Sequence, residues 1–137
     1  MISQVINSTT IPILQEVIGF AQARHGILAG NVANMDTPGY RVRDLSLETF
    51  QARLKEAIQT RHEQKQPISP GIVTNRPDDA MRRVHESLKS IEFHDGSNVG
   101  MEQQVIAATK NQFMHNVAIA IMTSQFRTLQ AAVSERV

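Results

Sequence analysis

This chain of 137 residues contains no cysteine and no tryptophan, and aromatic residues make up only 4% of it. The lack of cysteine excludes a disulfide framework and thiol chemistry, and it leaves the redox compartment undetermined. With so few aromatic residues, hydrophobicity comes from aliphatic side chains and methionine, which suit seams between helices better than a dense globular core. A formal charge of +1 gives no electrostatic case for binding nucleic acid.

No hydrophobic run is long enough to cross a bilayer, which takes about 20 residues. The longest apolar pattern, residues 11–32, is interrupted by Glu16, Gln22, Arg24 and His25. The first residues are polar, and no basic segment precedes the apolar stretch. We therefore expect neither a membrane span nor a cleavable signal peptide.

Charged residues are concentrated in the middle of the chain, and only eight of the 27 lie outside positions 41–95. Two charge-poor ends around a solvated centre are typical of termini that bury each other. This distribution predicts three parts. Residues 1–40 form an amino-terminal inner-core helix and a junction motif, residues 41–95 form a polar outer lobe, and residues 96–137 form a carboxy-terminal inner-core helix.

The amino-terminal part has the apolar spacing of a helix that packs against a partner. Alternating steps of three and four residues, with His25 in the one gap, connect Ile11, Leu14, Ile18, Ala21, Leu28 and Val32. Pro12 suits the first turn of a helix, and Thr9 or Thr10 can cap its start. We expect this helix to begin near Thr10.

The carboxy-terminal part has a longer and more regular seam of the same kind. Its unbroken four-three spacing connects Met101, Val105, Ala108, Gln112, His115, Ile119, Met122, Phe126, Leu129 and Val133. Other apolar residues flank the seam, so this helix is apolar almost all round and should be buried on several sides. Since the chain has little else to cover it, we expect the cover to come from other subunits.

The middle of the chain predicts a small irregular lobe. Ser46 can cap a helix whose apolar face contains Leu47, Phe50, Leu54, Ala57 and Ile58. Prolines between positions 66 and 79 break any helix there, and residues 72–74 and 90–93 are short strand candidates. The predicted fold class is mainly α. It comprises an antiparallel coiled-coil pair of terminal helices, over residues 10–35 and 100–135, and a middle lobe with one short helix and possible short strands.

The segment from Asn31 to Tyr40 predicts a helix stop followed by a turn. Pro38 cannot continue a helix, and it favours extended geometry at Thr37. Gly39 then permits a turn. The short amides of Asn31 and Asn34 can bond to backbone groups that a helix end leaves without partners.

The whole string LAGNVANMDTPGYRVRD, residues 28–44, closely resembles the signature of the bacterial flagellar axial proteins. That family comprises rod, hook and hook-associated subunits. Residues 40–44 and 93–99 resemble the proximal rod proteins within it. The resemblance covers roughly residues 1–50 and 93–137. The sequence departs from the family at Gly100, where such proteins commonly carry an aspartate that caps the second helix.

The resemblance implies a structural subunit of the proximal rod of the flagellar basal body, and not an enzyme. It also implies export by the flagellar type III system without a cleaved signal, and self-assembly into a hollow drive shaft and export channel in the periplasm. Implied partners are the rod proteins FlgC, FlgF and FlgG, the adaptor FliE, and membrane-ring and export-gate proteins. The predicted assembly interface comprises Ile11, Leu14, Ile18, Leu28, Asn31, Val32, Asn34, Thr37, Pro38, Gly39, Tyr40, Val105, Phe113, Val117, Ile119, Ile121, Met122, Phe126 and Leu129.

Two other functions stay open at this point. The chain is also similar in size to the other proximal rod protein, FlgC, and a stand-alone helical adaptor or export chaperone would have similar amphipathic helices.

The histidines do not form a recognisable catalytic or metal site. His85 with Glu86 and His94 with Asp95 lack the spacing of a metal motif, and His25 and His115 occupy seam positions, where packing is the simpler role. We therefore predict no catalytic, cofactor-binding or metal-binding residue.

Gly26 and Gly30 form a small-xxx-small pattern near the end of the first helix. The pattern indicates either flexibility in its last turns or close approach of another helix. The family resemblance favours the second interpretation.

Overall fold

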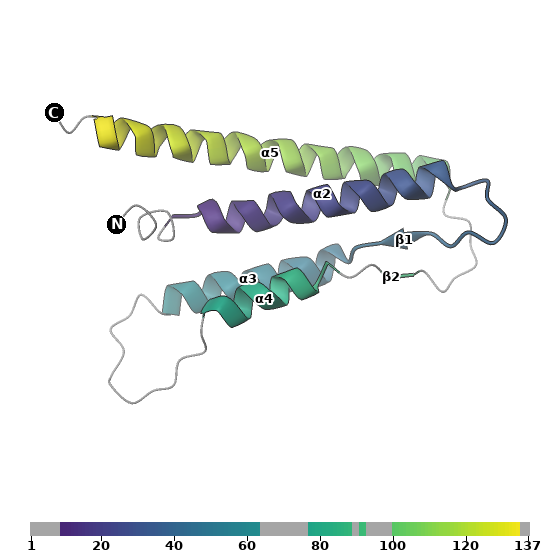
Figure 1. The fold of residues 1–137 in the computed structure, drawn as a ribbon, viewed down its shortest axis with the longest axis horizontal. Helices are drawn as coiled ribbons and strands as arrows, with labels where there is room; N and C mark the ends of the chain where they lie inside the picture. The colour runs from purple at the N-terminus through teal and green to yellow at the C-terminus, as the bar shows by residue number, and fades with distance from the viewer. Residues whose placement is uncertain (1–8, 64–76, 89–90, 93–99, 135–137) are drawn as a thin grey trace. The chain divides into compact units, whose positions relative to one another are not determined.

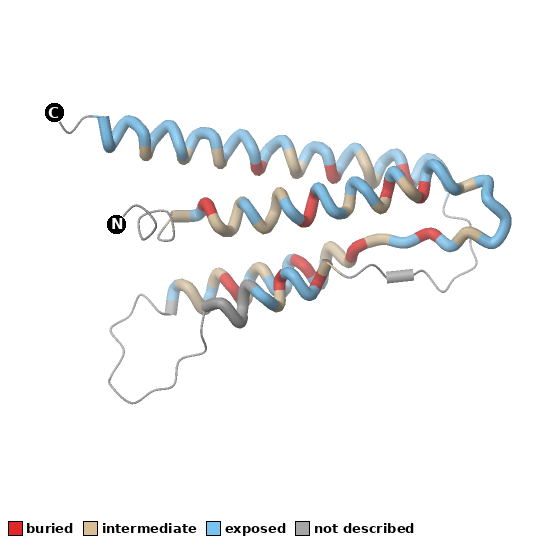
Figure 2. Tube along the Cα trace, in the orientation of Figure 1, coloured by how far each residue is buried: buried red, intermediate tan, exposed pale blue. Residues whose placement is uncertain are grey.

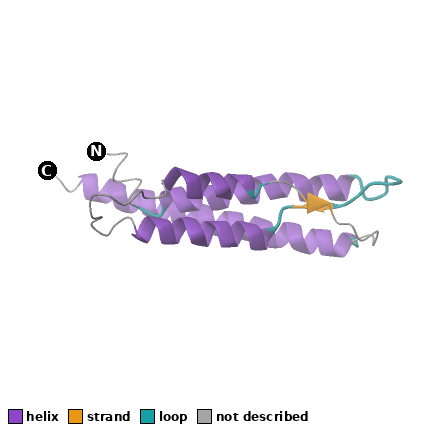
Figure 3. Ribbon diagram, turned by 90° about the horizontal axis from the view of Figure 1, so that it is seen from below, coloured by secondary structure: helices purple, strands orange, loops and turns teal. Residues whose placement is uncertain are grey.

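The computed structural model describes residues 9–63, 77–88, 91–92 and 100–134 of the chain. Most of these residues are helical (Figure 3), and the mainly α fold class is confirmed. In chain order the elements are α2 (Ile11–Ala33), β1 (Arg43–Asp44), α3 (Leu47–Glu63), α4 (Pro77–Glu86), β2 (Ile91–Glu92) and α5 (Met101–Ser134). The chain divides into two compact units, one of residues 1–40 with 97–137 and one of residues 41–96.

The first unit is an antiparallel pair of the long helices α2 and α5, which lie side by side (Figure 1). Helix α2 begins directly after Thr10, with Pro12 in its first turn, where a missing N–H leaves no bond unmade. The backbone N–H of Ile11 donates to Thr9 Oγ1 at 3.3 Å, so Thr9 supplies a cap. No helix in the described ranges is both long and apolar enough to cross a bilayer.

The row of α5 that faces α2 differs from the predicted seam. The buried residues of α5 are Gln104, Asn111 and Ala118, at a strict seven-residue spacing (Figure 2). Four predicted seam residues are half-buried beside this row: Ala108, His115, Met122 and Leu129. The other six are exposed, which corrects the prediction: Met101, Val105, Gln112, Ile119, Phe126 and Val133.

The row of α5 that faces α2 differs from the predicted seam because two helix backbones come close together only where the side chains between them are short. Amide side chains and alanine are short enough to let two helices approach, and the amides can hydrogen-bond across the gap. Large apolar residues stand on the flanks instead. The fully buried groups of α5 in its pairing with α2 are therefore polar or small, while most of the larger apolar groups of that helix remain exposed.

The second unit pairs α3 with α4. Ser46 caps α3 as predicted, because the backbone N–H of Thr49 donates to its Oγ at 3.1 Å. Phe50 and Ala57 of α3 and Val84 of α4 are buried. Helix α4 corrects the sequence prediction, in which the prolines between positions 66 and 79 break any helix. Proline is favoured at the first position of a helix, which is where Pro77 stands.

A short antiparallel ladder closes the second unit. Arg43 pairs with Glu92, and Asp44 pairs with Ile91. The strand predicted over residues 90–93 is thus confirmed at Ile91–Glu92, although its partner, β1, was not predicted. The other strand candidate, residues 72–74, lies outside the described residues.

Candidate assembly interface

A buried amide joins the end of α2 to the start of α5. Asn31 is fully buried, and its Nδ2 donates to Oε1 of Gln104 at 3.1 Å. Its Oδ1 accepts a hydrogen bond from the hydroxyl of Tyr40 at 3.1 Å. Since both the donor and the acceptor of the amide are used, any shift of register between the helices leaves a buried polar group unpaired. Asn31 and Gln104 therefore fix the alignment of the pair.

The turn after α2 is built from a chain of local hydrogen bonds. The carbonyl of Gly30 accepts from the backbone N–H of Asn34 at 3.1 Å and from its Nδ2 at 2.8 Å. The N–H of Thr37 then donates to the Asn34 carbonyl, and the N–H of Tyr40 to the Thr37 carbonyl. Gly39 has a φ of 78°, in the left-handed region that favours glycine.

The predicted bond from an asparagine side chain to the helix end is confirmed for Asn34 but not for Asn31. Asn34 bonds to the backbone of the helix end, as predicted. Asn31 instead uses its side chain to reach Gln104 and Tyr40, which lie far along the chain and after the turn. The signature segment is thus both a helix stop and an anchor for α5.

A second buried amide crosses the pair further along. Nδ2 of Asn111 donates to the backbone carbonyl of Ala21 at 2.7 Å. Its Oδ1 is buried without a hydrogen-bond partner in the described part of the chain. Burying an unpaired carbonyl oxygen costs about 1–3 kcal/mol, which offsets part of what the hydrogen bond to Ala21 contributes.

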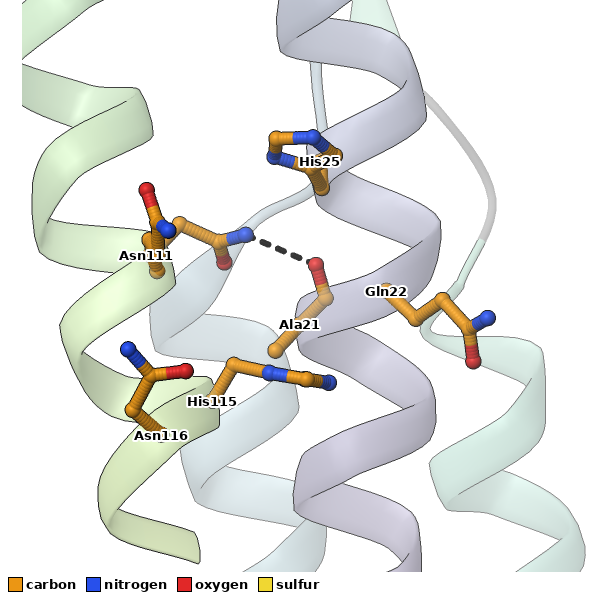
Figure 4. Close-up of a pocket in the computed structure, with 7 residues that line it drawn as sticks. Ala21, Gln22, His25, Asn111, His115 and Asn116 are labelled. Atoms are coloured by element: carbon orange, nitrogen blue, oxygen red, sulfur yellow. Dashed lines mark hydrogen bonds between the residues drawn. The ribbon is translucent and has the colours of Figure 1, made fainter. Parts of the chain in front are cut away.

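Asn111 lies at a pocket of about 360 Å³ between α2 and α5. Figure 4 shows His25 entering from α2 and His115 from α5. His25 is exposed and His115 half-buried, so His25 is not the packed seam residue that its spacing indicated. Among the residues that the structure describes, no group of three or more histidine, cysteine, aspartate or glutamate side chains could hold a metal ion.

The predicted interface residues fall into three groups by exposure. Buried within the chain are Ile11, Leu28 and Asn31. Half-buried are Leu14, Ile18, Tyr40, Met122 and Leu129. Exposed are Val32, Asn34, Thr37, Pro38, Gly39, Val105, Phe113, Val117, Ile119, Ile121 and Phe126. Contacts within the described part of the chain therefore fully bury only the first group.

The exposed sides of α5 carry large apolar groups. Phe113 is 71% exposed, and Ile106, which the predicted interface omitted, is 54% exposed. Full burial of a side chain of this kind stabilises a protein by about 1.5–3 kcal/mol. A row of such residues is a surface that a partner can cover.

Sequence reasoning missed Gln104 and Asn111 as the groups that pair α5 with α2. The signal was present as the seven-residue spacing of Gln104, Asn111 and Ala118. The larger apolar residues beside it outweigh this signal, because their four-three spacing already completes a seam in the sequence. The size of the apolar side chains alone does not identify the row of α5 that faces α2.

Comparisons with known proteins find similarity over most of the chain, although no family model matches it. The flagellar basal body rod protein FlgB of Proteus mirabilis HI4320 is 26% identical over 133 residues, which cover 88% of this chain and 90% of that protein. FlgB of Aquifex aeolicus is 25% identical, with 92% and 94% covered. FlgB of Bacillus subtilis is 22% identical, with 93% and 95% covered. The resemblance to rod proteins is thus confirmed: over most of its length, the chain is similar to flagellar basal body rod proteins named FlgB.

Proposed function

We propose that this chain is a structural subunit of the proximal rod of the bacterial flagellar basal body. The observation that carries the proposal is the inverted character of α5, whose buried row is Gln104, Asn111 and Ala118 while most of its large apolar residues are exposed. A helix of this kind suits a protein that is completed by its neighbours. The similarity to FlgB proteins supports the flagellar rod as that assembly.

The proposed mechanism is ordering that is coupled to assembly. The two ends of the chain travel unfolded through the flagellar type III export channel. At the growing rod, α2 and α5 form and bury their exposed apolar residues against neighbouring subunits. Since most helical stability in proteins comes from packing of an apolar face, contact with the neighbours supplies what the isolated pair lacks.

The proposed setting is the periplasmic base of the rod. The partners there are FlgC, the adaptor FliE and the ring and export-gate proteins, and FlgF and FlgG follow along the shaft. The segment from Asn31 to Asp44 links the inner helices to the outer lobe and contacts adjacent subunits. The role is mechanical, because the subunits form a hollow shaft that transmits torque, and it requires no catalysis.

The predicted interface residues divide between two tasks in this proposal. The exposed ones on α5 contact neighbouring subunits. The buried Leu28 and Asn31 hold α2 in the register that presents the remaining exposed residues, Val32 among them.

Removal of the gene from its bacterium tests this function. We expect the cells to lose swimming and complete rods, and a plasmid copy to restore both. Basal bodies purified from the restored cells should contain the chain, detected by mass spectrometry.

Two results would contradict the proposal. Swimming cells without the gene would exclude a rod subunit. A chain that is required for swimming but is found only inside the cell, bound to one export substrate, would identify the adaptor or chaperone instead.

A further inference from the structure

The junction from Asn34 to Tyr40 has little packing to fix its shape, because residues 36–39 are exposed. Two backbone hydrogen bonds span it. The N–H of Thr37 donates to the Asn34 carbonyl at 3.0 Å, and the N–H of Tyr40 donates to the Thr37 carbonyl at 3.1 Å. Exposed segments that are held by few contacts open at a low cost in free energy. A further contact is therefore needed to keep the junction in one shape.

Tyr40 makes that contact at the end of the junction. Its side chain is half-buried, and its hydroxyl donates to Oδ1 of the buried Asn31 at 3.1 Å. On its other side, the same amide donates from Nδ2 to Oε1 of Gln104, which lies 73 residues later, in the first turn of α5. The amide of Asn31 therefore bonds to the junction and to α5 at once.

The strength of the bond between Tyr40 and Asn31 depends on whether α5 is paired with α2. An amide that is open to water exchanges a tyrosine hydroxyl for a water molecule at little cost. With Gln104 against it, the Asn31 amide is buried, and loss of the Tyr40 hydroxyl leaves a buried acceptor unpaired. Pairing of α5 thus favours the closed junction. By thermodynamic reciprocity, a closed junction favours the pairing.

We propose that Tyr40 is a positioning residue that couples the shape of the junction to the pairing of α2 with α5. The inference rests on the proposed function, for which it supplies a control on assembly. The junction stays open until α5 is seated in the register that Asn31 and Gln104 define. A subunit whose α5 is absent or shifted does not present the closed junction to its neighbours.

Tyr40 can be observed by itself, because it is the only tyrosine of the chain. Isotope-labelled tyrosine in the full-length chain gives an NMR spectrum of this residue alone. A closed and an open junction place the Tyr40 ring in different surroundings, so the two states give separate signals. The ratio of these signals measures how often the junction is closed.

A cross-link between the helices can impose the pairing at a distance from the junction, since the natural chain has no cysteine. A hydrogen bond joins Asn111 to Ala21, and two turns further along the antiparallel helices stand Ala118 and Leu14. A thiol-reactive linker about one helical turn long can join the double variant Leu14→Cys with Ala118→Cys. We expect linking to raise the ratio of closed to open junction about tenfold.

Asn31→Leu in the linked chain tests whether the amide transmits this effect. Leucine keeps the branched shape of asparagine but has neither polar atom. We expect Tyr40 to keep the open signal, while circular dichroism shows that the linked helices are retained. Asn116→Leu makes the same substitution at an exposed position of α5 and should leave the closed signal in place.

Tyr40→Phe tests the reverse direction of the coupling and removes only one hydroxyl. The rate at which the linker joins the two thiols measures how often the helices are paired. We expect Tyr40→Phe to slow the linking about tenfold, because Oδ1 of Asn31 is then left without its donor when α5 pairs. In a chain that already carries Asn31→Leu, the same substitution should have no further effect.

Three results overturn the coupling. They are a Tyr40 signal that linking leaves unchanged, a closed signal that persists in the linked Asn31→Leu chain, and an equal effect of Tyr40→Phe with and without Asn31. All of these measurements use the isolated chain. Absence of the natural chain from basal bodies would instead overturn the proposed function, and it would leave the three results as they are.

Discussion

The two helix pairs of this molecule differ in the kind of residue that they bury. In the pair of α3 and α4, the apolar residues Phe50, Ala57 and Val84 are buried, and α4 is strongly amphipathic. In the pair of α2 and α5, the row that α5 buries is Gln104, Asn111 and Ala118, and α5 has almost no amphipathic character. The first pair separates apolar from polar residues as a self-sufficient surface helix does, and the second does not.

This difference indicates which helix pair is stable without neighbouring subunits. The α3 and α4 pair gains stability from its own buried apolar groups. The α2 and α5 pair contains buried apolar residues on α2, but α5 contributes amides whose main effect is to fix register. We therefore expect the terminal helices to depend on neighbours and the middle unit to be independent of them.

Placing a charge on the exposed apolar side of α5 should have the largest effect on the contrast between the two helix pairs. Phe113→Glu introduces a carboxylate into a surface that the assembly would bury, and an unpaired buried charge is costly. We expect complete loss of rods and swimming, with no change in the circular dichroism of the isolated chain, since Phe113 is exposed there. Gln130→Glu, at an exposed position of α5 that is off the side carrying Phe113, serves as the control and should swim. Swimming by Phe113→Glu cells would mean that this face of α5 stays free.

Truncation of one buried residue in each helix pair should show whether the two pairs unfold independently. In the isolated chain, Phe50→Ala should lower the free energy of unfolding of the middle unit by about 3–5 kcal/mol and abolish its thermal transition. Leu28→Ala, although Leu28 is equally buried, should leave that transition in place. The measurement is thermal unfolding followed by circular dichroism. Equal losses from the two substitutions would mean that α2 and α5 fold together with the middle unit before assembly.

Replacement of both Pro38 and Gly39 by alanine should have an intermediate effect. Alanine disfavours the positive φ of Gly39 by about 1–2 kcal/mol, and the loss of Pro38 frees the exit angle after α2. We expect swimming to fall much more than secretion of the subunit, because export does not require the folded turn. Swimming zones and secreted protein, measured in the same cultures, give the comparison. Normal swimming would show that the junction is merely a turn.

The smallest effect is expected from the exposed ion pair of α3. Arg53 contacts Glu56 at 3.3 Å, and both side chains are largely exposed. Water screens such a pair, so Arg53→Ala should change the free energy of unfolding of the middle unit by less than about 0.5 kcal/mol. The same unfolding measurement checks it beside Phe50→Ala. A loss as large as that of Phe50→Ala would mean that charge, and not apolar burial, stabilises this pair.

The helices of the first unit were largely predictable because their limits are set by local chemistry. Pro12 and the preceding threonines mark the start of α2, and Asn34 with Pro38 marks its end. The long four-three pattern before and after Phe113 indicated α5 over nearly its whole length. Such signals depend on neighbours in the chain, and a single sequence contains them in full.

The facing row of α5 and helix α4 were not predictable for a different reason. The apolar pattern of α5 is compatible with several faces, and only the hydrogen bonds to Asn31 and Ala21 select the row of Gln104 and Asn111. These bonds join residues far apart in the chain. For α4, the sequence around Pro77 is compatible with two structures, because proline can break a helix or stand at its first position. The packing of α4 on α3 selects the second.

Hydrogen exchange tests the dependence of α2 and α5 on their neighbours most directly. The backbone amides of both helices and of α3 are compared by mass spectrometry in the isolated chain and in purified basal bodies. We predict that α2 and α5 exchange rapidly in the isolated chain and become strongly protected in the basal body, whereas α3 is protected in both. Equal, strong protection of α2 and α5 in the isolated chain would contradict the account.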